Sequence, residues 1–381
     1  MSNEINISSM PAFNRRAFLR YTSLLAAAGA AFPFGGERAL AQVAFPTPHR
    51  TPPPDAVMLN LNENPMGPAP EALEAIYAVS RNGGRYQDSQ HVALQHKLAE
   101  LEGLKPEYIR CFPGTTETII QLSLAFTSPT RSYVQADPTF DIGANIASAV
   151  GARVVKVPLT KTYAHDVRAM VAAAPDAGLF YIATPNNPTG TVTPLDDIKW
   201  LVANKPKGSV VVVDEAYLHI QDNPEAATPL VQADQDVIIL RTFSKIYGMA
   251  GLRAGAAFGR PDLLKKLAIY NAPQLPASGM AGAVASLNVK GLVETRKKTI
   301  IDIREDVFSF LTKNNTPFIP SQANHFMMDV KRPGEQFIDA LQDQKVYIGR
   351  VWPILPTHVR VTVGTKDEME KFKTAFLKVN A

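Results

Sequence analysis

Five short segments of the chain carry side chains suited to chemistry, and each follows a run of apolar residues. One holds Lys245, and a lysine amine acts as a nucleophile when its surroundings lower its pKa. Asp214 ends the apolar run 210–213, and a carboxylate that leaves a buried strand needs a cationic partner. Thr115 and Thr116 open a helical stretch, where free backbone N–H groups attract an anion. The five segments are Gly114-Thr115-Thr116, Pro138-Thr139-Phe140, Asn186-Asn187-Pro188-Thr189-Gly190, Asp214-Glu215-Ala216-Tyr217 and Thr242-Phe243-Ser244-Lys245.

The apolar runs before these segments predict the scaffold that positions them. Short apolar runs alternate with stretches of helical spacing, such as 116–126 and 195–203, across residues 108 to 259. Several runs are almost wholly apolar, as in strands that are buried on both faces of a parallel sheet. We therefore expect an α/β fold with a mostly parallel central sheet, in which ligands bind beyond the carboxyl ends of the strands. The predicted strands are 108–112, 133–136, 153–157, 179–183, 210–213 and 237–240.

The C-terminal third predicts a second, smaller α+β domain. In residues 359–363 three valines alternate with Arg360 and Thr362, so that one face of the strand is apolar and the other polar. We expect 42–85 to be an N-terminal arm and part of the small domain, 86–275 the large cofactor-binding domain, and 276–381 the small C-terminal domain. The other predicted elements are an amphipathic helix at 295–311, a strand at 326–330, and helices at 333–344 and 366–378.

Residues 1–41 have the order of regions that is typical of an export signal. Arg15 and Arg16 precede Phe-Leu and a further arginine, which resembles the bacterial twin-arginine motif. A weakly apolar run follows at 24–34, and then the small-x-small cleavage pattern Ala39-Leu40-Ala41. The run is about half the ~20 residues that span a bilayer, so it does not predict a permanent anchor. We expect the twin-arginine export machinery as a partner and the periplasm as the location.

Composition excludes several classes of site and partner. The chain has 381 residues, a net charge of +4 and no basic stripe, so nucleic acid is not an expected partner. A single cysteine, Cys111, excludes an intramolecular disulfide and a cysteine-based metal cluster. His91 and His96 are five residues apart and no HExxH motif occurs, which argues against a zinc hydrolase. We predict no metal site.

The motifs taken together resemble a known family. The chain looks like the fold-type I aminotransferases, whose fold is the PLP-dependent transferase fold (PLP, pyridoxal 5′-phosphate), and in particular their histidinol-phosphate aminotransferase branch. The similarity runs from about residue 59 to the C-terminus. The segments that carry it are Leu61-Asn62-Glu63-Asn64-Pro65, Arg85-Tyr86, Asn186-Asn187-Pro188-Thr189-Gly190, Asp214-Glu215-Ala216-Tyr217, Thr242-Phe243-Ser244-Lys245 with Arg253, and Arg360-Val361-Thr362-Val363-Gly364.

The resemblance implies a role for each side chain around the cofactor ring. Lys245 would hold PLP covalently and then act as the base that moves the α-proton. Asp214 would pair with the protonated pyridine nitrogen, which keeps the ring an electron sink. Tyr217 and Asn187 would hydrogen-bond the ring 3-oxygen, although Asn187 also suits a turn of its own. Phe140 would stack on the ring face, where an aromatic residue after a strand is otherwise a core residue.

The family pattern also implies a phosphate cup built from two segments. Thr115 and Thr116 would offer hydroxyl and backbone donors at the start of a helix. Thr242 and Ser244 would add further hydroxyl groups. Arg253 would complete the cup as a bidentate partner of the phosphate.

Three more residues concern the substrate and the assembly. In the family the tyrosine that matches Tyr86 reaches the phosphate of the neighbouring subunit, which implies a homodimer with shared sites. Arg360 would bind the carboxylate or phosphate of the substrate, and Arg350 would be a second anion contact. The family branch usually has Val-Arg-Asp and a longer loop there, whereas this chain has Gly349-Arg350-Val351-Trp352-Pro353. The departure concerns the substrate pocket and not the cofactor pocket.

These expectations combine into a predicted function. We expect an exported PLP-dependent aminotransferase that moves an amino group between an amino acid or related amine and a 2-oxo acid. A PLP-dependent decarboxylase that resembles threonine-phosphate decarboxylase shares the same motifs and remains an alternative. The second alternative is an exported binding protein that keeps the fold without catalysis, although the intact lysine, aspartate and arginine argue against it.

Overall fold

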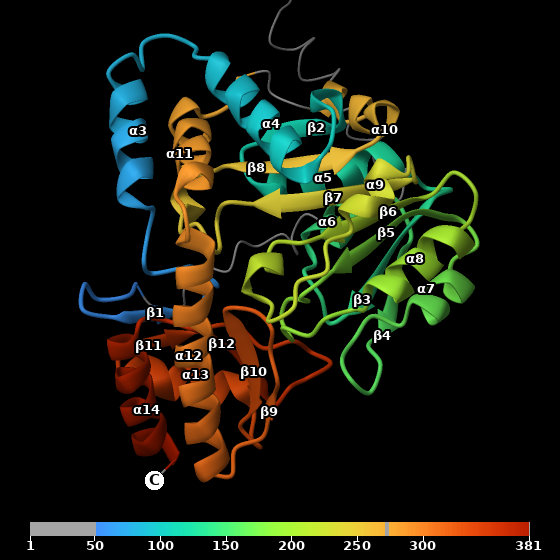
Figure 1. Ribbon diagram of the computed structural model, residues 1–381. Helices are drawn as coiled ribbons and strands as arrows, with labels where there is room; N and C mark the ends of the chain where they lie inside the picture. Colours follow the sequence, from blue (N-terminus) through green and yellow to red (C-terminus); the bar gives the residue numbers. More distant parts are fainter. Residues whose placement is uncertain (1–50, 271–273, 381) are drawn as a thin grey trace, which may run out of the picture. The chain divides into compact units, whose positions relative to one another are not determined.

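A seven-stranded sheet organises the larger domain of the chain (Figure 1). The computed structural model describes residues 51–270 and 274–380. Neighbouring strands pair in parallel except β8, which is antiparallel to both β2 and β7. The prediction of an α/β fold with a mostly parallel sheet is therefore confirmed. In spatial order the strands are β2 (Ile109–Phe112), β8 (Gly255–Gly259), β7 (Val237–Thr242), β6 (Val210–Asp214), β5 (Ala177–Ala183), β3 (Ser132–Asp137) and β4 (Val154–Pro158).

Helices cover both faces of this sheet, because its strands are apolar on both sides. In β6, Val211 and Val213 belong to one apolar cluster, while Val210 and Val212 belong to another. The first cluster includes side chains of α4 (Ser89–Glu102), α7 (Val167–Ala173), α8 (Leu195–Asn204) and α9 (Thr228–Gln232). The second includes side chains of α5 (Thr115–Phe126), α6 (Ile142–Ala149) and α10 (Pro261–Lys265).

Strand β8 is the one member of the sheet that the sequence does not predict. Its sequence is Gly-Ala-Ala-Phe-Gly, which has too few β-branched side chains to look like a strand. The small residues let the backbone of β8 lie close to the turn before α5. A Cβ on Gly255 would lie only 3.1 Å from the Cα of Gly114. Because β8 is antiparallel, it begins at the edge where β2 and β7 end, and Arg253, two residues before β8, lies at that edge.

Two small sheets and their helices form the predicted smaller C-terminal domain. Strands β12 (His358–Thr362), β10 (His325–Asp329) and β9 (Phe318–Ile319) make an antiparallel sheet. Strand β1 (Val57–Leu59) pairs in parallel with β11 (Val346–Ile348), so the N-terminal segment joins the C-terminal one. Helices α13 (Gly334–Asp343) and α14 (Lys366–Asn380) pack against these strands.

The remaining helices connect the two domains. Helix α12 (Leu292–Lys313), which includes the predicted helix at 295–311, contacts both η3 (Leu218–Ile220) of the large domain and α14. Helix α3 (Pro70–Ser80) packs along α11 (Ala277–Asn288), which also contacts α4 (Figure 1). The domain boundaries given from the sequence remain predictions.

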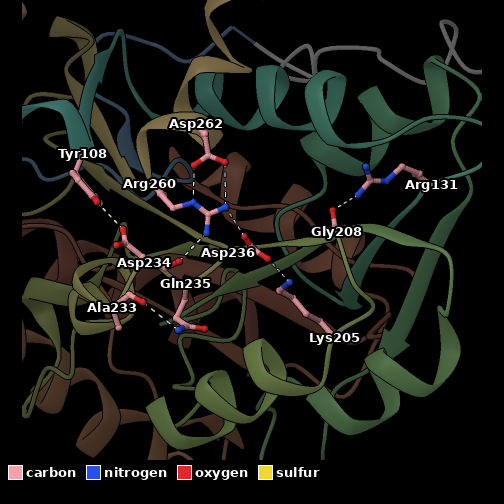
Figure 2. Close-up of polar contacts among 10 residues, drawn as sticks. All are labelled: Tyr108, Arg131, Lys205, Gly208, Ala233, Asp234, Gln235, Asp236, Arg260 and Asp262. Carbon is pink, nitrogen blue, oxygen red and sulfur yellow. Dashed lines mark hydrogen bonds and ion pairs between the residues drawn. The ribbon is translucent and has the colours of Figure 1, made fainter.

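A network of ion pairs ties strand ends together at the amino-terminal edge of β6 and β7 (Figure 2). The carboxylate of Asp236 accepts from Lys205 at 3.1 Å and lies 2.9 Å from a guanidinium nitrogen of Arg260. Arg260 also pairs with Asp262 at 2.6 Å. Because this cluster lies at the edge opposite the five motifs, it supports the sheet without touching them.

The predicted export signal, residues 1–41, lies outside the described residues. Among the residues that are described, none of the helices combines the length and the apolar character that a membrane crossing requires.

Candidate functional site

The five sequence motifs meet in one cavity at the carboxyl ends of β2, β3, β5, β6 and β7. Its volume is about 310 Å³. The strands β2, β3, β5, β6 and β7 all run in the same direction, which brings their ends to one edge of the sheet. The predicted site residues that line the cavity are Thr115, Thr116, Phe140, Asn187, Asp214, Tyr217, Thr242, Ser244, Lys245, Arg253 and Arg360.

Lys245 extends into this cavity from the loop after β7. Its Nζ donates to the carbonyl oxygen of Asn62 at 2.9 Å and to that of Leu61 at 3.5 Å. The Nζ also lies 5.4 Å from the ring centre of Tyr217. The lysine is thus held by neutral oxygens and an aromatic ring rather than by a carboxylate, so its amine stays accessible to a reacting group in the cavity.

Asp214 is a buried carboxylate at the end of β6. Its Oδ2 accepts from the hydroxyl of Tyr181 at 2.8 Å, and its Oδ1 accepts from the backbone N–H of Ala216 at 3.1 Å. Burial raises the pKa of Asp214 to about 6, although the hydrogen bonds and the Lys245 charge oppose that shift. A buried carboxylate without an ion pair is suited to a cationic ligand group.

Tyr217 and Asn187 lie on either side of the same cavity. The hydroxyl of Tyr217 accepts from Asn62 Nδ2 at 3.0 Å, which leaves its own proton free to donate. The Oδ1 of Asn187 accepts from Arg360 at 2.7 Å, which fixes the amide so that its nitrogen faces away from that arginine. Both residues therefore keep a donor for a bound oxygen.

The donors for an anion gather around Arg253. Gly114 precedes α5 with a φ of +91°, and a Cβ there would lie 2.3 Å from a guanidinium nitrogen of Arg253. Only glycine therefore leaves room for the arginine beside the helix N-terminus. Thr242 donates to the Ser244 hydroxyl at 2.9 Å, and that oxygen lies 3.5 Å from Arg253. Helix α5 starts without a side-chain cap, so its first N–H groups suit a phosphate.

Arg360 closes the opposite side of the cavity from β12. Its guanidinium donates to Asn187 and, at 2.6 Å, to the carbonyl oxygen of Asn60, and it lies 5.5 Å from the ring centre of Trp352. Its buried Nε has no hydrogen-bond partner among the described residues. Burial lowers the pKa of Arg360 to about 10, and the nearby Arg350 charge acts in the same direction. A rigid, buried guanidinium in the wall of the cavity is suited to a carboxylate.

Two predicted site residues do not line this cavity. Arg350 pairs instead with Asp141 at 2.9 Å, and its guanidinium lies 4.7 Å from the ring centre of Trp352. Tyr86 is 81% exposed and lines a separate hollow together with Arg85. A reach across a dimer interface requires such an exposed position, so the role of Tyr86 remains a prediction.

The structure also gives roles to residues for which the sequence predicts none. Asn62 contacts both Lys245 and Tyr217, and its φ of +54° is a left-handed value that asparagine tolerates. Asn60 contributes only its carbonyl oxygen, which no sequence pattern reveals. Tyr181 stands inside an apolar strand, where a tyrosine looks like a core residue.

Comparisons with known proteins agree with this geometry. The family description "Aminotransferase class I and II" matches residues 54–376. The histidinol-phosphate aminotransferase of Symbiobacterium thermophilum is 34% identical over 324 residues, which are 84% of this chain and 90% of that protein. A solved structure from Erwinia carotovora atroseptica matches with a TM-score of 0.83 and 30% identity, covering 87% of this chain and 98% of that chain.

A second solved structure shows the same fold at lower identity. It is the histidinol-phosphate aminotransferase of Sinorhizobium meliloti in complex with pyridoxal-5'-phosphate, with a TM-score of 0.79 and 23% identity. The alignment covers 98% of this chain and 99% of that chain.

Proposed function

The chain belongs to the class I and II aminotransferases, enzymes that depend on pyridoxal 5′-phosphate, and from this premise we propose that its amino donor is an α-amino acid whose carboxylate binds Arg360. The observation that carries the proposal is the buried guanidinium of Arg360, which lines the same cavity as Lys245 and Asp214. A carboxylate bound there would place the α-carbon in the same cavity as the lysine amine.

The residues present fit the cofactor. Gly114 leaves the room beside Arg253 that the phosphate cup needs, and the unpaired Asp214 carboxylate suits a pyridinium. When bound, PLP supplies the electron sink for the α-carbon of the substrate. Arg253, Ser244 and the start of α5 would hold its phosphate, and Asp214 would hold the proton on its ring nitrogen.

The side chains of the cavity would bind the substrate, transfer the proton and hold the cofactor ring. Arg360 would orient the amino acid through its carboxylate. Lys245 would take the proton from the α-carbon of the donor as a general base and, in the second half-reaction, would give a proton to the α-carbon of the acceptor as a general acid. Tyr217 and Asn187 would donate hydrogen bonds to the ring oxygen, and Phe140 would cover the ring face and exclude water.

The pairing of Arg350 with Asp141 favours an amino donor that carries only one anionic group. Arg350 is a second guanidinium whose charge acts on Arg360, and it is already paired with Asp141 at 2.9 Å. A second carboxylate on the substrate would have to compete with Asp141. We therefore expect amino acids with an uncharged side chain to react better than dicarboxylic ones.

Histidinol phosphate is the second candidate donor, because relatives at 30–34% identity are histidinol-phosphate aminotransferases. Its phosphate would occupy Arg360 in place of a carboxylate. Histidine synthesis is a cytoplasmic pathway, whereas we propose an exported protein, and this argues for the amino acid.

The test is a set of single turnovers with the PLP-loaded protein. A panel of amino acids, and histidinol phosphate, are supplied one at a time without an acceptor. The absorbance of the bound cofactor, the released oxo product and the released carbon dioxide are measured for each. Oxo product without carbon dioxide from an amino acid supports the proposal, whereas oxo product from histidinol phosphate alone would favour that donor. Carbon dioxide instead would make the protein a decarboxylase, and no reaction with any donor would favour a binding protein. Lys245→Ala is the control and should retain the fold without turnover.

We further propose export through the twin-arginine machinery. The support is the ordered signal pattern within residues 1–41. Cell fractionation should find mature protein in the periplasm, with a new N-terminus near Gln42. The double change Arg15→Lys with Arg16→Lys should block export, and cytoplasmic full-length protein in the unaltered strain would contradict the proposal.

A further inference from the structure

We propose that Tyr181 is a positioning residue that acts on the cofactor through Asp214, by holding this carboxylate ionised and aimed at the pyridine nitrogen. The hydroxyl of Tyr181 donates to Asp214 Oδ2 at 2.8 Å, and both side chains are buried. Tyr181 also lines the cofactor cavity itself. The inference rests on the cofactor assignment and not on the identity of the amino donor.

The sheet register fixes this contact. Strands β5 and β6 pair in parallel, with Ala183 opposite Asp214 and Tyr181 opposite Val212. Tyr181 and Val212 face the same side of the sheet, since both belong to the same apolar cluster. Asp214, two residues after Val212, points to that side as well. The phenol and the carboxylate are therefore diagonal neighbours on a rigid surface, and the hydrogen bond needs no loop to form it.

Asp214 depends on this hydroxyl because its other stabilising contacts are few. The carboxylate has one further hydrogen bond, from the N–H of Ala216. Lys245 adds a favourable charge without an ion pair, and the neighbouring Glu215 adds an unfavourable one. A buried carboxylate that loses one of two donors becomes a better proton acceptor. The shared proton would then move from the ring nitrogen towards Asp214, and the ring would withdraw electrons less strongly.

The chain offers a matched control in Tyr133 on β3. Its ring stacks with that of Tyr181 at 6.4 Å between centres, and both side chains are fully buried. The Tyr133 hydroxyl has no hydrogen-bond partner among the described residues and lies in the space that Gly143 leaves open. Tyr133→Phe thus removes an equally buried hydroxyl from the same stack without touching Asp214.

The experiment compares Tyr181→Phe, Tyr133→Phe and the unaltered protein, each loaded with PLP labelled with ¹⁵N in the ring. The ring-nitrogen chemical shift reports its protonation at a fixed pH, and equilibrium dialysis gives the PLP dissociation constant. We expect Tyr181→Phe to move the shift towards that of unprotonated pyridine and to lower kcat by about tenfold or more, the effect of a hydrogen bond to a charged group. Tyr133→Phe should leave the shift unchanged.

Equal shifts in the two variants, or none in Tyr181→Phe, would overturn the proposal. A second test uses Asp214→Asn at saturating PLP, in which the ring nitrogen has no carboxylate partner. Adding Tyr181→Phe to this variant should change the ring-nitrogen shift no further, because the tyrosine acts through Asp214. A further change would show that Tyr181 acts by another route. Failure of the unaltered protein to bind PLP would instead count against the cofactor assignment itself.

Discussion

Arg253 and Gly114 bring two unusual backbone conformations together at the proposed anion site. Arg253 has a φ of +55° and Gly114 a φ of +91°, and both lie where β2 ends and β8 begins. Left-handed values are costly for most residues, so they persist where the surroundings require them. Here they turn the guanidinium towards the start of α5.

Gly114→Ala should therefore weaken PLP binding. The new Cβ would lie 2.3 Å from a guanidinium nitrogen of Arg253 and push the arginine out of the cup. We expect the PLP dissociation constant to rise at least about tenfold, or about 1.4 kcal/mol. Gly208→Ala is the matched control, since Gly208 also has a positive φ of +81° but no atom within 4 Å of a Cβ. It should cost roughly 1–2 kcal/mol of stability and leave PLP affinity unchanged.

Replacement of Arg360 and replacement of Arg350 should lower kcat/KM by very different amounts. Arg360→Ala removes a buried guanidinium, so kcat/KM for an α-amino acid should fall by an amount on the order of 2–5 kcal/mol. Arg350→Ala removes a half-exposed partner of Asp141, and the loss should be about 0–1 kcal/mol. Steady-state kinetics on both variants, with the cofactor spectrum as the check on the PLP site, decides the assignment. Equal losses would show that Arg350 binds the substrate too.

At the residue scale, the site residues that could be predicted from the sequence are those that lie in recognisable motifs. Lys245, Asp214 and Arg253 stand after apolar runs, and the structure brings all three to one cavity. The roles of Tyr181 and Asn62 were not predicted, for a physical reason, although Asn62 lies in a segment that resembles the family. The role of Tyr181 depends on strand register, and that of Asn62 on contacts with residues more than a hundred positions away. Neither relation leaves a local pattern.

At the element scale, the strands with β-branched residues were predictable and the small-residue strand was not. Val210 to Val213 is apolar on both faces, and the structure extends this strand by only one residue, to Asp214. Strand β8 has no β-branched residues, because small residues are needed where it packs closely against the turn between β2 and α5. The strands predicted at 326–330 and 359–363 each begin and end one residue earlier in the structure.

The ion-pair network in Figure 2 gives a prediction for sheet stability. Burial alone would raise the pKa of Asp236, but Lys205 and Arg260 outweigh it and hold the pKa below the ordinary value of 3.8. The stabilisation is thus present above that value and is lost as pH falls through the folded-state pKa. Asp236→Asn should cost about 0.5–1 kcal/mol at neutral pH, a modest figure because the carboxylate is partly exposed.

Urea unfolding from neutral pH down to about pH 3 checks this prediction. The difference between the unaltered protein and Asp236→Asn should shrink as the pH falls. Asp302→Asn is the control, since its pair with Lys298 on α12 is exposed on both sides. A difference that stays constant with pH would mean that charge is not the cause.

At the scale of the whole molecule, exposed apolar side chains support the expected homodimer. Leu73 and Tyr77 are 41% and 71% exposed, and their spacing of four places them on one face of α3. Other side chains of α3, among them Ile76 beside Gly282, pack along α11. We expect the protein to sediment as a dimer, and Leu73→Glu with Tyr77→Glu to give monomers with reduced PLP affinity. Leu377→Glu on α14, 49% exposed, should leave the dimer intact. A fully active monomer of the unaltered protein would contradict the shared site.

The contacts of Arg360 and Asn62 mean that the catalytic pocket is closed by the two ends of the described chain. Arg360 donates to the carbonyl oxygen of Asn60, and the N–H of Asn62 donates to the Thr362 hydroxyl at 2.9 Å, each across a separation of 300 positions. During translation, Asn60 and Asn62 are synthesised early and their partners Arg360 and Thr362 near the end. All strands of the large sheet are synthesised before β12, whereas the contacts of Asn60 with Arg360 and of Asn62 with Thr362 form only after β12 emerges. An interrupted chain that lacks β12 would therefore already contain the residues proposed for the cofactor, but not the arginine proposed for the substrate.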